Sequence, residues 1–360
     1  MMKSQRYRLT FTTPAFLGNA DQHAQWRTPP IKALLRQWWR VAYAAEQKFD
    51  VDVTAMRRAE GLLFGHAWLE NDAVERNGRT EKVAARKSEV RLRLSHWKDG
   101  SLGKRQWPEF ATVNHPEVKS SVGSDLYMGF GPLVYDKASR RSGLKANAAI
   151  QAGESADLSL AYPDESAPQI ERALCLINLF ATVGGRSRNG WGSLHLESLE
   201  GTSPSQTSVP LRDWQQALAL DWPHAIGQDG QGALTWQTRP FDDWKALMQK
   251  LAIIKIGLRT QFRFTTRRDE PRPEDRHWLS YPITNHSVRA WDGKARLPNS
   301  LRFKVRPAPD NSRQYVGVIF HMPCLPPLAL NPEENTITRV WERVHQFLDT
   351  PTQQLTRISA

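Results

Sequence analysis

A chain of 360 residues, of which 40% are hydrophobic and 24% charged, exceeds one typical domain and is too apolar to be disordered, so two cores of roughly 150 residues each are expected. The net charge of +12 favours a polyanionic partner, chiefly nucleic acid, although solubility or an anionic membrane surface would account for the same excess. Only two cysteines, Cys175 and Cys324, are present, which excludes a disulfide framework and a cysteine-based metal site.

No apolar stretch is long enough to span a bilayer, and the first residues have no apolar segment of the kind found in signal peptides. We therefore expect a soluble, cytoplasmic protein with no membrane partner and no cofactor.

The N-terminal half alternates strands and helices. Residues 13–30 are expected to form a loop, residues 125–136 an extended segment with a glycine bend, and residues 70–87 a mobile charged loop. Apolar residues recur with a period of two or at helical spacing in the segments expected to be regular. The expected strands are 6–12, 88–96, 156–162 and 194–199, and the expected helices are 29–45, 54–64 and 167–183.

The C-terminal half follows the order strand, helix, strand, strand, helix, strand. These elements are expected at 233–237, 241–256, 301–306, 315–321, 333–349 and 354–358. With its insertions removed, the N-terminal half has the same order. The fold class predicted is α+β, with two ferredoxin-like units: residues 1–200 carrying insertions and a glycine-rich loop, a linker region at 201–230, and residues 231–360.

Residues 184–193 hold four glycines between a buried helix and a strand. Glycine admits positive φ and a close backbone approach, so successive N–H groups can form a nest for an anion. Arg186 and Arg188 add forked guanidinium donors, and they are the only basic residues between Arg172 and Arg212. The segment therefore predicts a phosphate-binding loop, with a plain helix-to-strand connection as the alternative.

A second basic surface is expected on the first helix. Lys32, Arg36 and Arg40 follow one another at four-residue spacing, and Trp39 and Tyr43 fall on the same flank, roughly opposite the apolar face. Cations interleaved with exposed aromatic rings suit single-stranded RNA, whereas aromatics tucked against a neighbouring element would leave only a solvated basic face.

Motifs of known enzymes are missing. The glycine loop lacks the ending of a P-loop, Pro132 stands where a dinucleotide fingerprint would begin its helix, and there is no metal-spaced cluster of histidine and cysteine. The residues predict no catalytic site and no metal site.

Four segments resemble the RAMP superfamily of CRISPR proteins, and within it the family of the first Cmr subunit of type III-B effectors. They are residues 13–20 (Thr-Pro-Ala-Phe-Leu-Gly-Asn-Ala), 29–40, 60–65 and 184–193. They occur in the family's order over about 190 residues. One departure is Ala33, where the family resemblance leads us to expect glycine.

The resemblance implies two ferredoxin-like folds and a non-catalytic subunit that binds near the 3′ end of the CRISPR RNA and assists capture of the single-stranded target RNA. The implied partners are these RNAs and the other Cmr and RAMP subunits. The alternative is a RAMP endoribonuclease that processes precursor CRISPR RNA, with His195 as general acid or base. A small-molecule enzyme that binds a nucleotide at the glycine loop is the third possibility.

The residues expected to contact RNA lie on the first helix, just before it, and in the glycine loop. They are Arg27, Lys32, Arg36, Trp39, Arg40, Gly184, Gly185, Arg186, Ser187, Arg188, Gly190 and Gly192.

Overall fold

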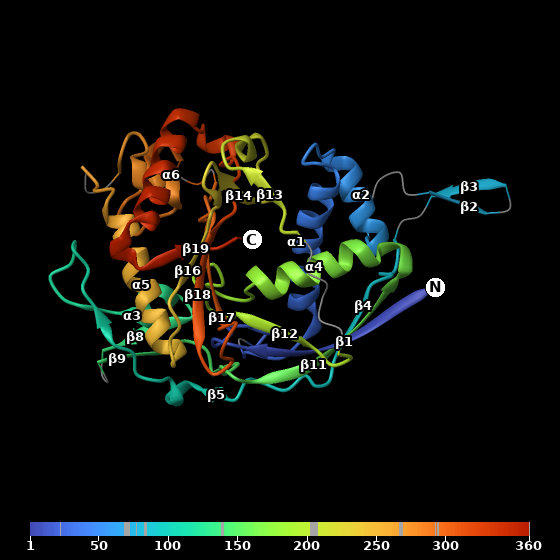
Figure 1. Ribbon diagram of the computed structural model, residues 1–360, viewed down its shortest axis with the longest axis horizontal. Coiled ribbons are helices and arrows are strands. Elements are labelled where there is room, and N and C mark those ends of the chain that lie inside the picture. The colour runs from blue at the N-terminus through green and yellow to red at the C-terminus, as the bar shows by residue number, and fades with distance from the viewer. Residues whose placement is uncertain are drawn as a thin grey trace.

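The computed structural model describes residues 1–21, 23–67, 73–76, 78–82, 85–137, 140–201, 208–265, 269–291, 293 and 295–359. Within these residues the chain forms two units side by side, each with a four-stranded antiparallel sheet and helices (Figure 1). The fold is α+β, as predicted.

The N-terminal unit contains one sheet and three longer helices. The sheet has the order β12-β1-β11-β4, so that the first strand lies between the fourth and the third. The strands are β1 (Met2–Phe11), β4 (Arg91–Leu94), β11 (Ser155–Pro163) and β12 (Leu194–Ser198), and the helices are α1 (Thr28–Glu46), α2 (Val53–Phe64) and α4 (Ala167–Phe180).

Alternation along β1 determines which face of this sheet is covered. Tyr7, Leu9 and Phe11 are buried, whereas Arg6 and Arg8, on the opposite face of the strand, are exposed. Antiparallel pairing places Leu9 opposite Leu196 of β12, so apolar side chains meet on one face. The apolar side of α1 packs against β4 and α4, and the unit closes around this core.

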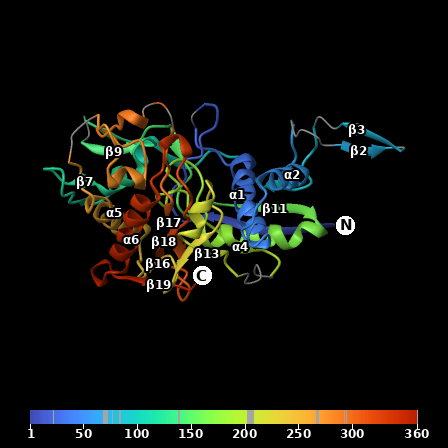
Figure 2. The same ribbon diagram turned by 90° about the horizontal axis from the view of Figure 1, so that it is seen from above.

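Insertions between these elements form short strands and one short helix. The expected loop at 70–87 includes, in its described part, the hairpin of β2 and β3, which projects from the N-terminal unit in Figures 1 and 2. The extended segment expected at 125–136 is wrong in its first half, which is the helix α3. The inserted elements are β2 (Ala73–Arg76), β3 (Arg79–Lys82), β5 (Leu102–Gly103), β6 (Thr112–Val113), β7 (Val122–Gly123), α3 (Ser124–Gly129), β8 (Leu133–Asp136), β9 (Arg141–Leu144) and β10 (Ala148–Ala149).

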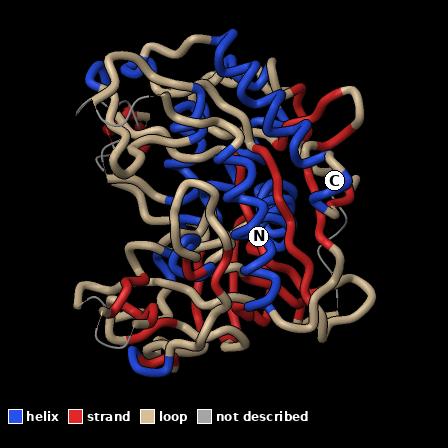
Figure 3. Tube along the Cα trace, turned by 90° about the vertical axis from the view of Figure 1, so that its left-hand side faces the viewer, coloured by secondary structure: helices blue, strands red, loops and turns tan. Residues whose placement is uncertain are grey.

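The C-terminal unit repeats the strand order of the first. Its sheet runs β17-β18-β16-β19, again with the first strand between the fourth and the third. The elements are β16 (Thr235–Thr238), α5 (Trp244–Thr260), β17 (Leu301–Pro307), β18 (Tyr315–His321), α6 (Glu334–Asp349) and β19 (Leu355–Arg357). Loops and short 3-10 turns connect α5 to β17. Loops cover much of the face of the molecule shown in Figure 3.

The region expected to be a linker, 201–230, is largely folded where it is described. It contributes β13 (Leu211–Asp213) and β14 (Ile226–Asp229), which form a small sheet with β15 (Gly232–Ala233). Trp214 and Leu218 are buried in the C-terminal core. Residues 202–207, the centre of the expected linker, lie outside the described residues.

The two cores meet through β18 and the C-terminal end of α4. The ring of Phe320 lies 5.0 Å from the ring of Phe180, and Val318 and Met322 also belong to the N-terminal core. Conversely, Trp191 and the inserted Met128 and Leu133 pack in the C-terminal core.

Short 3-10 turns complete the regular structure of the described residues. They are Lys104–Gln106, Asp164–Ser166, Gln216–Ala219, Asp275–Leu279, Arg289–Trp291, Leu328–Leu330 and Pro351–Gln353.

Among the helices described, none combines the length and the apolar character that crossing a membrane requires.

Candidate nucleic-acid interface

The glycine loop, residues 184–193, connects α4 to β12 at the junction of the two units. Gly184, Arg186, Gly190 and Gly192 have positive φ. Glycine is most tightly required at Gly192, where φ is +65° and an added Cβ would lie 1.9 Å from the Val183 carbonyl oxygen.

Buried hydroxyl groups fix the inner half of the loop. The carbonyl oxygen of Gly190 accepts hydrogen bonds from Thr13 Oγ1 at 2.7 Å and from Ser193 Oγ at 2.8 Å. Ser193 Oγ also accepts from the backbone N–H of Val305 in the C-terminal unit, at 2.9 Å. The loop is therefore anchored to both units before any ligand binds.

An aromatic cluster holds the loop from a second side. Trp191 is fully buried, and its ring lies 5.4 Å from that of Phe16 and 5.6 Å from that of Trp107. Because Phe16 O also accepts a 3.0 Å hydrogen bond from Gly185 N, the segment after β1 and the glycine loop form one packed body.

The outer turn of the loop leaves backbone donors available. The N–H groups of Asn189 and Gly190 donate within the loop, to Arg186 O and Ser187 O. Across the described chain, no acceptor is found for the successive N–H groups of Arg186, Ser187 and Arg188. Three adjacent free donors are the arrangement that binds an anion in a nest, although fewer of the loop's N–H groups are free than expected.

The two arginines of the loop differ in their hydrogen-bond partners. Arg186 Nε donates a 2.5 Å hydrogen bond to Phe130 O, which ties it to the inserted segment after α3. The guanidinium of Arg188 has no hydrogen-bond or ion-pair partner within the described residues. Burial lowers the pKa of both side chains.

The basic side chains of α1 already contact acceptors in α2. Glu60 of α2, which is buried, accepts hydrogen bonds from Arg36 Nε at 2.7 Å and from Arg40 Nε at 2.8 Å. Lys32 Nζ donates to Phe64 O at 3.0 Å. Burial, then the charge of Arg36, lowers the pKa of Lys32. One carboxylate pairs with two of these three cations, and the Arg36 and Arg40 side chains are 39% and 41% exposed, so a positive excess remains at the surface.

The expectation that Trp39 is an exposed stacking residue is wrong. Trp39 is 1% exposed, and its Nε1 donates to Gln169 Oε1 of α4 at 2.7 Å. Its ring lies 5.2 Å from that of Tyr43 and 5.8 Å from that of Phe64. Contacts with α2 and α4 cover Trp39, so it belongs to the core, and the partly buried Tyr43 packs against that core.

Arg27 lies at the start of α1, next to the segment that supports the glycine loop. Its Nη2 donates to Gly18 O, and its Nε is buried without a hydrogen-bond partner. Gly184 approaches the same segment, since an added Cβ there would lie 2.7 Å from Phe16 O. Arg27 and the glycine loop are thus connected through residues 16–18.

His195 lies on β12 opposite Thr10, on the face of the sheet away from the buried Leu194 and Leu196. Burial lowers its pKa, and Lys304 adds to the effect. His195, on the strand that follows the loop, is therefore neutral at pH 7.

Sequence reasoning missed the side chains that hold the loop from the C-terminal unit. Lys255 Nζ on α5 donates to Asn189 Oδ1 at 2.7 Å, and Asn189 Nδ2 donates to Met128 O at 2.7 Å. Burial, then Arg259, lowers the pKa of Lys255 well below its usual value. The available signal was a lysine within an apolar helix, which alone does not identify its partner.

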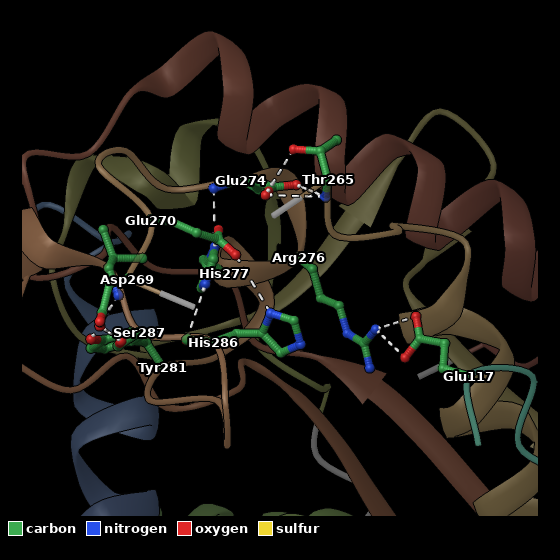
Figure 4. Close-up of polar contacts among 11 residues, drawn as sticks. Glu117, Thr265, Asp269, Glu270, Glu274, Arg276, His277, Tyr281, His286 and Ser287 are labelled. Atoms are coloured by element: carbon green, nitrogen blue, oxygen red, sulfur yellow. Dashed lines mark hydrogen bonds and ion pairs between the residues drawn. The ribbon is translucent and has the colours of Figure 1, made fainter. Parts of the chain in front are cut away.

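A separate polar cluster is formed by residues of the connection from α5 to β17, together with Glu117 from the insertion before α3 (Figure 4). Glu270 and His277 are buried, with 3.8 Å between Glu270 Oε2 and His277 Nδ1, and His286 Nδ1 lies 3.5 Å from Glu270 Oε1. Arg276 Nη1 contacts both carboxylate oxygens of Glu117, at 2.7 and 2.8 Å. Within the described ranges, no three histidine, cysteine or acidic residues are grouped as a metal site would require. These contacts fasten the long connection from α5 to β17.

Two solved structures are similar to this chain over nearly its whole length. Cmr1 from Pyrococcus furiosus, in its apo form, is 13% identical with a TM-score of 0.48, and the match covers 99% of each chain. A chain of the type III-B Cmr-beta complex bound to cognate target RNA and AMPPnP is 10% identical with a TM-score of 0.42, covering 95% of this chain and 98% of that one.

No curated protein matches the sequence. The family model of the RAMP superfamily matches residues 8–195, which include the end of β1, α1, α4, the glycine loop and the start of β12. The match spans more than half of the 360 residues. The chain therefore belongs to the RAMP superfamily.

Proposed function

We propose that this RAMP protein is a non-catalytic RNA-binding subunit of a type III-B CRISPR effector, the Cmr complex. In this role it binds near the 3′ end of the CRISPR RNA and assists capture of the target RNA. Its partners are then single-stranded RNA and the other Cmr and RAMP subunits, and it acts in the cytoplasm without a cofactor.

The observation that carries RNA binding is the outer turn of the glycine loop. It presents three successive backbone N–H groups, from Arg186, Ser187 and Arg188, and the guanidinium of Arg188, which has no partner among the described residues. Backbone donors and arginine together suit phosphate and do not depend on base identity. The rigid support by Thr13 and Ser193 means that little of the binding free energy is spent on ordering the loop.

The position of the protein within the family rests on sequence. The segments 13–20, 29–40, 60–65 and 184–193 resemble the first Cmr subunit more specifically than the glycine loop alone does. We further propose that both units are ferredoxin-like. Each sheet has its first strand between its fourth and third, and the longer helices lie in the connections from first to second and from third to fourth strand.

Among the sites first expected, Arg27 and the partly exposed Arg36 and Arg40 remain candidates for phosphate contacts. Arg36 and Arg40 already pair with Glu60, so they would supply long-range attraction more than tight contacts. Trp39 is not proposed as an RNA contact.

The test is RNA binding by the double variant Arg186→Ala plus Arg188→Ala. We expect weaker binding to single-stranded RNA of any sequence and a salt dependence of log affinity flattened by about 1.4, at about 0.7 per phosphate. The matched control is Arg289→Ala plus Arg313→Ala, which removes the same charge from exposed positions of the C-terminal unit. An unchanged salt slope in the loop variant would leave residues 184–193 a structural connection.

Cleavage of repeat RNA separates this proposal from the endoribonuclease alternative. Incubation of the purified protein with repeat RNA in EDTA should leave the RNA intact. Metal-independent cleavage that disappears in His195→Ala would replace the binding-only function by processing of precursor CRISPR RNA. Copurification from native extracts with CRISPR RNA and Cmr subunits tests the assembly, and a stable monomer free of both would contradict it.

A further inference from the structure

Strand β17 carries three cations on the face that meets the N-terminal unit. Arg302, Lys304 and Arg306 alternate with apolar residues that face the C-terminal core. Two of the three have polar partners: Lys304 Nζ donates to Ile177 O at 2.9 Å, and Arg306 Nη2 donates to Gln237 Oε1 at 3.3 Å. Arg302 is the exception.

The positive charge of Arg302 is buried with no negative charge paired to it in the described chain. Arg302 is 8% exposed, its Nε is sealed from solvent with no hydrogen-bond partner, and no carboxylate pairs with its guanidinium in the described chain. Burial lowers its pKa to about 9, and the positive charge of Arg188 contributes. An arginine keeps its proton in folded proteins, so this shift indicates an uncompensated charge rather than a neutral side chain.

Backbone pairing brings Arg188 to the same place. Phe303 N donates to Arg188 O at 3.0 Å, and Asn189 and Phe303 form a parallel bridge. Residues paired across strands share a face, so Asn189 and Phe303 point to α5, where Asn189 meets Lys255. Arg188 and Arg302, one position earlier, point together to the opposite face.

The neighbouring groups do not supply a negative charge. Cys324 lies close enough for both arginines to act on its thiol, yet burial raises the pKa of that thiol to about 11, so it is neutral at pH 7. Asp221 acts on the Cys324 thiol, and among the described residues no ion pair joins it to Arg188 or Arg302. Two like charges therefore face each other at a junction that is otherwise well packed.

We propose that Arg188 and Arg302 form a site for one phosphate-type oxyanion, which in the RNA complex is a phosphodiester group held between the two units. The identity of that anion rests on the proposed function, but the site itself does not. Two guanidinium forks can each donate paired hydrogen bonds to oxygens of the same phosphate. The adjacent free N–H groups of the loop's outer turn lie on the same backbone. Phosphate would thus tie the glycine loop to β17 across the junction.

The first experiment measures thermal unfolding in inorganic phosphate against chloride at equal ionic strength. We expect phosphate to raise the Tm of the wild-type protein and to have no such effect on Arg302→Met or Arg188→Met. In chloride alone, Arg302→Met should be at least as stable as wild type, because it removes charge repulsion and an unpaired donor. The control Arg306→Met, which removes a cation with a partner from the same strand, should keep the phosphate response.

The second experiment measures single-stranded RNA binding. Arg302→Met should flatten the salt slope by about 0.7, the value for one phosphate contact. Arg302→Lys should keep that slope but bind more weakly, since a lysine loses the fork. If wild-type protein binds no RNA while phosphate still raises its Tm through Arg188 and Arg302, the proposed function fails and the site stands as one for a free phosphate or nucleotide.

The inference is overturned if Arg302→Met destabilises the protein in chloride and retains the wild-type response to phosphate. Arg302 would then be a packing residue. Arg188→Met, in the accessible loop, decides the matter even if Arg302→Met fails to fold, because a normal phosphate response and RNA salt slope in that variant also contradict the site.

Discussion

The amine of Lys304 on β17 donates a 2.9 Å hydrogen bond to the carbonyl oxygen of Ile177, near the C-terminal end of α4. A second bond, of 2.8 Å, reaches Asn178 O. Ile177 O also accepts the bond from Ala181 N that ends the helix. The C-terminal end of a helix carries partial negative charge, so a cation is well placed there. The contact joins the edge strand of one unit to the helix that precedes the glycine loop of the other.

We expect Lys304→Met to weaken this junction. The carbonyl oxygen of Asn178 would lose its donor, at a cost of about 1–3 kcal/mol, whereas that of Ile177 would keep the bond from Ala181 N. The loss is partly offset because the buried ammonium is no longer desolvated. Urea denaturation should show a lower midpoint, with intrinsic tryptophan fluorescence as the probe. Lys245→Met, at an exposed position of α5, is the control and should unfold like wild type. Equal midpoints for the two variants would contradict the role of Lys304.

Trp39 should contribute to stability rather than to RNA binding. Truncation of this buried ring by Trp39→Ala is expected to cost about 3–5 kcal/mol, whereas Trp39→Phe keeps most of the packing and loses mainly the bond to Gln169. Chemical denaturation ranks the three proteins, and filter binding measures RNA affinity. A folded Trp39→Phe protein with strongly reduced affinity would restore the stacking role.

Local pattern predicted the order of the main elements, because strand and helix periods depend on neighbouring residues. The expected strand at 315–321 is β18, and the expected helix at 333–349 is α6 within one residue. The burial of Trp39 could not be predicted from local pattern. A single helix has one clear apolar face, but α1 is enclosed by α2, α4 and the sheet, and only the tertiary arrangement shows it.

The candidate site was predicted in part. Four glycines and two arginines located the loop, but the side chains that hold it or complete it come from residues far away in sequence. Thr13 precedes the loop by more than 170 residues, and Lys255 and Arg302 follow it in another unit. A run of alternating cations on β17 looks like a solvated face in sequence, and its burial follows from the second unit packing over it.

Gly192 and Gly185 should respond differently to alanine. At Gly192 the positive φ and the 1.9 Å approach to Val183 O leave no room for a Cβ, so Gly192→Ala is expected to fold poorly. Gly185 does not have positive φ, and an added Cβ there would lie 2.9 Å from Pro132 Cγ. Gly185→Ala should therefore lower stability moderately. Soluble yield and Tm compare the two, and equal effects would contradict the difference in backbone geometry.

Glu60 should stabilise the docking of α2 on α1. Glu60→Gln removes the charge that accepts three hydrogen bonds from Arg36 and Arg40, each worth about 1.5–3 kcal/mol to a charged partner before desolvation is subtracted. We expect a lower Tm and, since two guanidinium groups are released, unchanged or tighter RNA binding. Glu46→Gln, at the exposed end of α1, is the control. A Tm equal to that of wild type would show that the ion pairs contribute nothing net.

The buried histidine pair of the C-terminal unit should make the protein sensitive to acid. His345 Nε2 lies 3.0 Å from His321 Nδ1, and His321 Nε2 lies 3.0 Å from Ser300 Oγ. Burial lowers the pKa of His345 to about 3, with Asp229, Asp349 and Arg357 as the charged neighbours, and burial also lowers the pKa of His321 well below its usual value.

The sign of the effect follows from proton binding. Below the ordinary histidine pKa of about 6.5, these histidines bind protons in the unfolded chain but stay neutral in the folded protein. The free energy of unfolding therefore falls as the pH drops from about 6.5 towards 3. Each histidine contributes a slope of up to about 1.4 kcal/mol per pH unit. His345→Gln should show a shallower loss between pH 6.5 and 4 in urea denaturation, whereas His23→Gln, at a side chain 38% exposed, should follow wild type. Parallel curves for His345→Gln and wild type would mean that other groups account for the acid sensitivity.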